Sequence, residues 1–69
     1  DIRFIAEMLK TNKRIVFLDL YYSYIRDDDA ERLLEALKQN NTLKTIGLKD
    51  TYISAGMKKK FIDKGLKVL

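Results

Sequence analysis

The stretches IVFLDLYYSYI at residues 15–25 and LKTIGLKDTYI at residues 43–53 share one pattern at an offset of 28 positions. Apolar residues occupy the first, fourth, sixth and eleventh places of both stretches, and Tyr occupies the tenth place of both. Apolar residues two positions apart are typical of a short strand with one buried face. A pattern that returns after roughly 20 to 50 residues is typical of a repeat protein. The two stretches therefore predict equivalent parallel strands in neighbouring repeats.

The rest of each period has the spacing of an amphipathic helix. Apolar residues recur three and four positions apart in the stretches 2–9 and 30–37, with charged residues between them. Asp28 is a favoured N-cap residue, and Glu31 three positions later would complete a capping box. The sequence therefore predicts a helix before each of the two strands.

The chain resembles leucine-rich repeats of the long class typified by ribonuclease inhibitor in two segments, AEMLKTNKRIVFLDL at 6–20 and LEALKQNNTLKTIGL at 34–48. The sequences of these segments are also similar to repeats of tropomodulin and leiomodin. The resemblance implies an α/β fold, a right-handed solenoid of about two and a half repeats with short parallel strands on one face and helices on the other. It divides a single domain, residues 1–69, into a partial repeat 1–14 and the repeats 15–42 and 43–69.

Two places depart from the repeat pattern. The family usually has Asn in the turn after the strand, whereas Ser23 and Thr51 stand there, and their hydroxyl groups make weaker turn bonds. Phe61 and Ile62 match Leu33 and Leu34 of the preceding helix and predict a third helix, but Gly65 stands where its stripe requires an apolar residue. Either Gly65 ends the helix in a left-handed conformation and residues 66–69 form a third strand, or the helix continues to residue 69. We favour the strand.

Composition excludes several kinds of site. The chain has 69 residues, no Cys and no His, which excludes disulfides and leaves no Cys or His nucleophile or metal ligand. We therefore expect a protein that is not an enzyme, needs no cofactor and binds no metal; the absence of Cys favours a cytoplasmic location. The longest apolar run, residues 15–18, is too short to span a membrane. The acidic run 27–29 suits a helix start, and the basic run 58–60 suits a solvated helix face.

The strand residues between the buried leucines are expected to point out from the concave face of such a solenoid. Phe and Tyr are favoured anchors in protein interfaces, and Gly47 beside Phe17 would leave room for an inserted side chain. Phe17 and Tyr21 could equally pack across the strands, and the recurrence of Tyr24 and Tyr52 favours a structural role in the turn. The predicted partner-binding residues are Phe17, Asp19, Tyr21, Tyr22, Thr45 and Lys49.

These residues predict a protein–protein interaction module that binds a partner protein through its concave strand face. One alternative is a structural segment of a longer array, or a small solenoid that self-associates through its open ends. A weaker alternative is a basic surface for nucleic acid or anionic lipid, since the formal net charge is +4. Nucleic-acid surfaces usually combine basic residues with interleaved aromatic residues or a known motif, and the basic segments here lack both.

Overall fold

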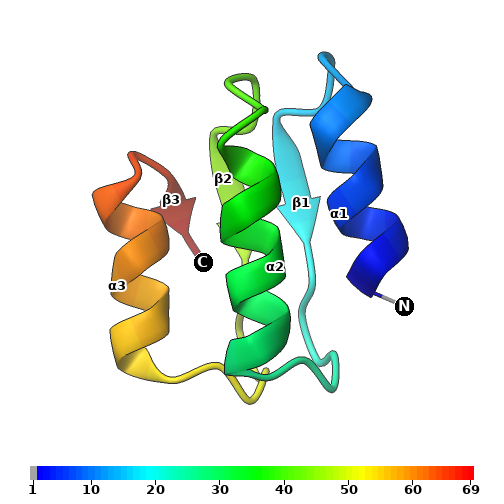
Figure 1. Cartoon of the computed structure of the whole chain (residues 1–69). Coiled ribbons are helices and arrows are strands. Elements are labelled where there is room, and N and C mark those ends of the chain that lie inside the picture. The colour runs from blue at the N-terminus through cyan, green and yellow to red at the C-terminus, as the bar shows by residue number, and fades with distance from the viewer. Residues whose placement is uncertain (1) are drawn as a thin grey trace.

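A computed structural model describes residues 2–69 and shows helices alternating with short strands (Figure 1). Three parallel strands form one sheet in the order β1-β2-β3, and a helix connects each neighbouring pair. The helices lie side by side in one layer on one face of this sheet. The elements are α1 (Ile2–Thr11), β1 (Phe17–Asp19), α2 (Asp27–Leu37), β2 (Thr45–Gly47), α3 (Ala55–Asp63) and β3 (Lys67–Val68). The chain therefore has a mixed α/β fold.

The predicted pairing of the two repeated stretches is confirmed. Leu18 of β1 lies opposite Ile46 of β2, so the sheet register keeps the 28-position offset of the sequence. Ile46 in turn lies opposite Val68 of β3. Backbone bonds between the chain segments continue past β1, because Leu20 donates to the Gly47 carbonyl at 2.8 Å. Each repeat of the sequence pattern thus packs directly against the next.

The core lies between the sheet and the helix layer. Leu18 and Leu20 are buried, as the two-residue spacing predicts. The apolar stripes of the helices meet these residues, which removes apolar side chains of both layers from water. The largest fully buried side chains are Leu9, Leu33, Leu37, Ile46, Leu48 and Phe61. The predicted alternation of strand and helix therefore encloses one continuous core.

The start of α2 differs from the predicted cap. The helix begins at Asp27 with Arg26 at the N-cap position, so the expected capping box of Asp28 and Glu31 is wrong. The Asp29 carboxylate instead accepts a hydrogen bond from the Arg26 backbone N–H at 3.1 Å. The Arg26 side chain has no acceptor and cannot bind the free backbone N–H groups at the start of α2. The acidic residues of the first turn instead supply the negative charge that is favourable near a helix N-terminus.

The C-terminal part follows the favoured interpretation. Helix α3 ends at Asp63, and Gly65 has a φ of +103°, in the region that favours glycine. The Gly65 N–H donates to the Ile62 carbonyl at 2.9 Å, and the chain then enters β3. The alternative of a helix continuing to residue 69 is therefore wrong.

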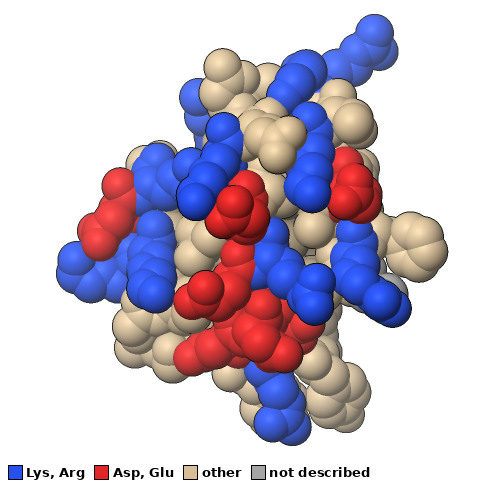
Figure 2. Space-filling view, in the orientation of Figure 1, with Lys and Arg blue, Asp and Glu red and all other residues tan. Residues whose placement is uncertain are grey.

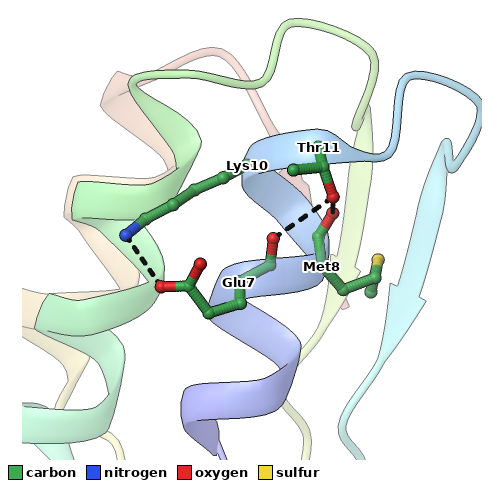
Figure 3. A network of polar contacts seen from close by, with 4 residues as sticks. All are labelled: Glu7, Met8, Lys10 and Thr11. Atoms are coloured by element: carbon green, nitrogen blue, oxygen red, sulfur yellow. Dashed lines mark hydrogen bonds and ion pairs between the residues drawn. The ribbon is translucent and has the colours of Figure 1, made fainter.

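The end of α1 is held by side chains of its last turns (Figure 3). Thr11 Oγ1 donates to the backbone carbonyls of Glu7 and Met8 at 3.5 and 3.4 Å. Lys10 Nζ lies 3.1 Å from the Glu7 carboxylate. The Met8 carbonyl also accepts the Asn12 backbone N–H at 2.7 Å, so the Thr11 hydroxyl is a second donor to this carbonyl.

The connections between helix and strand depend on two asparagines 28 positions apart. Asn40 is buried, and its Nδ2 donates to the carbonyls of Leu9 at 2.8 Å and Asn12 at 2.9 Å. Its Oδ1 accepts the backbone N–H groups of Thr42 at 3.0 Å and Leu43 at 2.9 Å. Asn40 therefore connects the end of α1 to the chain segment that enters β2. The family usually has its asparagine in the turn after the strand, whereas Asn40 makes its hydrogen bonds in the connection before the strand.

Candidate functional site

The sheet face turned away from the helices carries the predicted residues of β1. Phe17 is 48% exposed and Asp19 is exposed, while Leu18 between them is buried. On β2, Thr45 lies opposite Phe17 and is half-buried. We call this face, formed by Phe17, Asp19, Tyr21 and Thr45, the strand face. The alternation along β1 therefore presents one aromatic ring beside one carboxylate.

The expected space beside Gly47 is filled by the chain itself. Gly47 lies opposite Asp19 rather than beside Phe17. A Cβ atom added to Gly47 would lie 2.6 Å from Cε1 of Tyr21, so the Tyr21 ring rests on the Gly47 backbone. The expectation of room for an inserted side chain is therefore wrong. Tyr21 is half-buried, and glycine at position 47 lets its ring approach the backbone of β2.

Tyr22 has an unusual backbone conformation. Its φ is +62°, and Asp50, 28 positions later, has a φ of +60°. Asp tolerates this left-handed region, whereas a residue such as Tyr costs about 1–2 kcal/mol there. Tyr22 is 69% exposed, and its ring meets the Tyr21 ring edge-on, with centroids 6.1 Å apart. The same turn thus occurs in both repeats, and the first repeat carries an exposed aromatic residue in it.

Two further tyrosines stack at the turns that lead into the helices. The rings of Tyr24 and Tyr52 are nearly parallel, with an interplanar angle of 17° and centroids 5.8 Å apart. The guanidinium carbon of Arg26 lies over the Tyr52 ring, 5.6 Å from its centroid. Tyr24 is 84% exposed and Tyr52 is 60% exposed, so this stack lies on the surface. We call Tyr22, Tyr24 and Tyr52 the tyrosine edge.

Sequence reasoning assigned Tyr24 and Tyr52 to the turn but missed that they form an exposed stack. The signal was present, because Tyr occupies the tenth place of both repeated stretches. In a parallel arrangement with a 28-position register, identical places lie next to each other in neighbouring repeats. An aromatic residue repeated at one exposed place therefore predicts stacked rings.

Backbone bonds between the repeats hold the tyrosine edge in place. Tyr22 N–H donates to the Lys49 carbonyl at 3.0 Å, and Tyr52 N–H donates to the Ile25 carbonyl at 2.9 Å. Ser54 N–H donates to Asp27 Oδ1 at 2.7 Å. The predicted weak turn bonds also form in part, since Thr51 Oγ1 donates to the Leu48 carbonyl at 2.7 Å. The rings therefore project from a fixed backbone.

Asp27 links the start of α2 to Ser54, the N-cap residue of α3. The backbone N–H of Ser54 lowers the Asp27 pKa, and the Ser54 hydroxyl and the charge of Lys60 lower it further. A carboxyl group whose pKa is lower in the folded state stabilises the fold above its unfolded pKa, and this contribution is lost as pH falls through the acidic range.

We therefore expect Asp27→Asn to be less stable than the original chain at neutral pH. The difference should shrink below about pH 4, where the unfolded carboxyl group becomes protonated. Urea denaturation at neutral and acidic pH measures it. Asp28→Asn is the control, because the Asp28 side chain has no hydrogen bond or ion pair within residues 2–69. A difference for Asp27→Asn that stays constant with pH would contradict this assignment.

Charge is divided between two edges of the molecule. The connections from helix to strand, residues 10–16, 38–45 and 64–68, carry seven Lys and Arg and no acidic residue. The segments 19–29 and 47–54, on the opposite edge, carry five aspartates against Arg26 and Lys49. Figure 2 shows the largest group of acidic side chains in the lower middle of the view, near the start of α2, while basic side chains predominate above it with separate acidic side chains among them.

The basic edge has a structural explanation. Cations near helix C-termini and anions near helix N-termini are both favoured by the helix dipole. Lys13 donates to the Gln39 carbonyl, and Lys44 donates to the Asn41 carbonyl at 3.3 Å. Lys10 pairs with Glu7 at 3.1 Å, and Lys38 pairs with Glu35 at 3.0 Å. Outside this edge, on α3, Lys59 pairs with Asp63 at 3.1 Å and Lys60 pairs with Glu31 at 3.5 Å. These basic residues therefore make hydrogen bonds to loop carbonyls and ion pairs on the helix surfaces.

Within residues 2–69, no group of three or more acidic side chains is arranged to hold a metal ion. In the same residues, no helix has the length and apolar character needed to cross a membrane.

A pocket of about 370 Å³ adjoins the tyrosine edge, between the start of α1 and the turn before α2. Its lining residues are Ile2, Ile5, Leu20, Ser23, Tyr24, Ile25 and Asp29.

Comparison with known proteins gives no assignment: no protein-family model matches the chain, and no curated protein sequence matches it. The function proposed below therefore rests on the chemistry of the strand face and the tyrosine edge.

Proposed function

We propose that this chain is a stretch of leucine-rich-repeat solenoid that binds another protein through its strand face. The observation that carries this proposal is the 48% exposure of Phe17 on the sheet face turned away from the helices. The parallel order β1-β2-β3 and the 28-position register support the repeat assignment. The binding role follows from the chemistry of the exposed face and from the resemblance to the repeat family.

Phe17 and Tyr21 have the properties of interface anchors. Aromatic side chains bring a large contact area and few rotatable bonds, so fixing them on binding costs little conformational entropy. Tyr21 is already held against Gly47, and β1 is already paired with β2. A side chain that is ordered before binding loses less freedom on binding. The strand face therefore offers a preorganised aromatic centre, with Asp19 and Thr45 beside it and Lys49 exposed further along.

The double variant Phe17→Ser/Tyr21→Ser tests the proposal. Loss of two anchors at about 2 kcal/mol each would weaken binding by roughly a thousandfold. Affinity capture from cell extract, followed by titration of the captured protein, measures the change. Phe4→Ser on α1 is the matched control, because Phe4 is 80% exposed and lies on a helix rather than on the strand face.

The proposal predicts a protein that binds the original chain and the Phe4→Ser variant but not the double variant. Circular dichroism melts should show that the double variant remains folded, since Phe17 is half exposed and Tyr21 lies on the sheet surface. Equal affinity of the folded double variant for every captured protein would remove the strand face as the binding site.

A further inference from the structure

We infer that the tyrosine edge binds a basic, arginine-containing peptide segment of the partner protein. The inference rests on the proposed function and names the chemistry of the partner beside the strand face. The two surfaces are continuous, because Tyr21 of the strand face and Tyr22 of the tyrosine edge meet ring to ring with centroids 6.1 Å apart.

The chain itself already places a guanidinium group on this edge. Arg26 lies over the Tyr52 ring at 5.6 Å from its centroid, within the range at which a cation is attracted by the electron-rich face of the ring. Tyr52 in turn stacks on Tyr24 at 5.8 Å. Arginine is the cation that stacks best on aromatic faces, because its guanidinium group is planar and weakly hydrated. The edge therefore has the ring chemistry that a second arginine requires.

The exposure and backbone of the tyrosines are not explained by folding. All three rings are more than half exposed, so the core does not need them. Tyr22 holds a left-handed conformation that costs energy, although Asp at the equivalent place adopts it readily. Residues held in rarely populated backbone conformations cluster at active sites and at ligand-binding positions.

Charge complementarity selects a basic partner. The segments 22–29 and 49–52, which hold the tyrosine edge, carry four aspartates against Arg26 and Lys49, in a chain whose formal net charge is +4. The charge of Lys60 also acts on one of these aspartates, Asp27. Asp27 and Asp29 are engaged with backbone N–H groups, whereas Asp28 and Asp50 form no side-chain hydrogen bond or ion pair within residues 2–69. The opposite edge carries seven basic residues and would repel the same peptide. This division of charge would direct a basic segment to one edge only.

Short synthetic peptides of alternating Gly and Arg, Gly and Lys, or Gly and Glu test the inference by fluorescence anisotropy with the full chain. We expect the Arg peptide to bind, the Lys peptide to bind less tightly, and the Glu peptide not to bind. Affinity for the Arg peptide should fall as salt concentration rises, because exposed charges are screened.

The variant Tyr24→Leu/Tyr52→Leu removes the aromatic faces and keeps apolar side chains, and we expect it to bind the Arg peptide about tenfold more weakly. Tyr24→Phe/Tyr52→Phe keeps the rings and should stay within about threefold of the original chain. Phe4→Leu is the matched control for an exposed aromatic residue elsewhere, and it should bind unchanged. Tyr22→Asn relieves the strained backbone, so a gain in thermal stability together with weaker peptide binding is expected.

Three results would overturn the inference: equal binding of the Arg and Glu peptides, unchanged binding by Tyr24→Leu/Tyr52→Leu, or tighter binding of a short oligothymidine than of the Arg peptide. The inference and the proposed function can fail separately. A partner lost by Phe17→Ser/Tyr21→Ser but retained by Tyr24→Leu/Tyr52→Leu leaves the proposed function standing and removes the tyrosine edge. A partner retained by the first variant removes the strand face.

Discussion

Leu48→Ala is expected to lower the free energy of unfolding by about 2–5 kcal/mol, because Leu48 is completely buried and its removal leaves a cavity in the core. A folded chain of this length has a total stability of only about 3–10 kcal/mol. The substitution should therefore remove a large share of the total stability and shift the denaturation midpoint strongly downward. Leu20, at the equivalent place one repeat earlier, is also buried, and we expect the same kind of loss at that position.

Chemical denaturation followed by circular dichroism measures this loss. Leu69→Ala is the matched control, since Leu69 is 42% exposed and its backbone hydrogen bonds are unaffected by the substitution. We expect the control to lose less than about 1 kcal/mol. A cooperative transition for Leu48→Ala at the midpoint of the original chain would contradict the assigned core.

Asn40→Ala is expected to cause the second large loss, about 2–4 kcal/mol. The side chain of Asn40 satisfies two carbonyls at the end of α1, and its oxygen accepts backbone N–H groups at the start of the next strand segment. Alanine would leave these groups unpaired in a region closed to water, and an unpaired buried polar group is costly. The loss should appear in denaturation midpoints and in faster amide hydrogen exchange near Leu43.

Asn41→Ala is the control for this prediction, because Asn41 is exposed and takes part through its backbone carbonyl only. Asn12→Ala should fall between the two, since Asn12 Oδ1 accepts two backbone N–H groups in a more exposed place. Equal stability of the Asn40 and Asn41 variants would show that the network between repeats contributes little.

The strands and the core could be predicted because the repeat supplies two independent copies of the same pattern. Leu18 and Leu20 match Ile46 and Leu48, so burial of one pair argues for burial of the other. The third strand could be favoured because glycine at position 65 suits a left-handed turn that other residues rarely adopt.

Features set by contacts between repeats could not be predicted in the same way. The Asp28 cap failed because three consecutive aspartates at residues 27–29 offer several starting points, and the bond between Ser54 and Asp27 fixes one of them. The offset of 28 positions places Gly47 opposite Asp19, so that neighbour could have been predicted, but spacing alone does not show that the Tyr21 ring covers Gly47. Phe17 and Asp19 of the strand face are exposed, whereas Tyr21 and Thr45 are half-buried, and the use of this face in binding stays a prediction.

The central claim is that repeated stretches stack in parallel with a 28-position register and leave Phe17 and the tyrosines on the surface. Nuclear Overhauser contacts in the labelled chain test this claim most directly. We predict contacts across the sheet between Leu18 and Ile46 and between Ile46 and Val68, together with ring contacts between Tyr24 and Tyr52. Helical contacts around Leu18, or an antiparallel pairing of residues 17–19 with residues 45–47, would contradict the account.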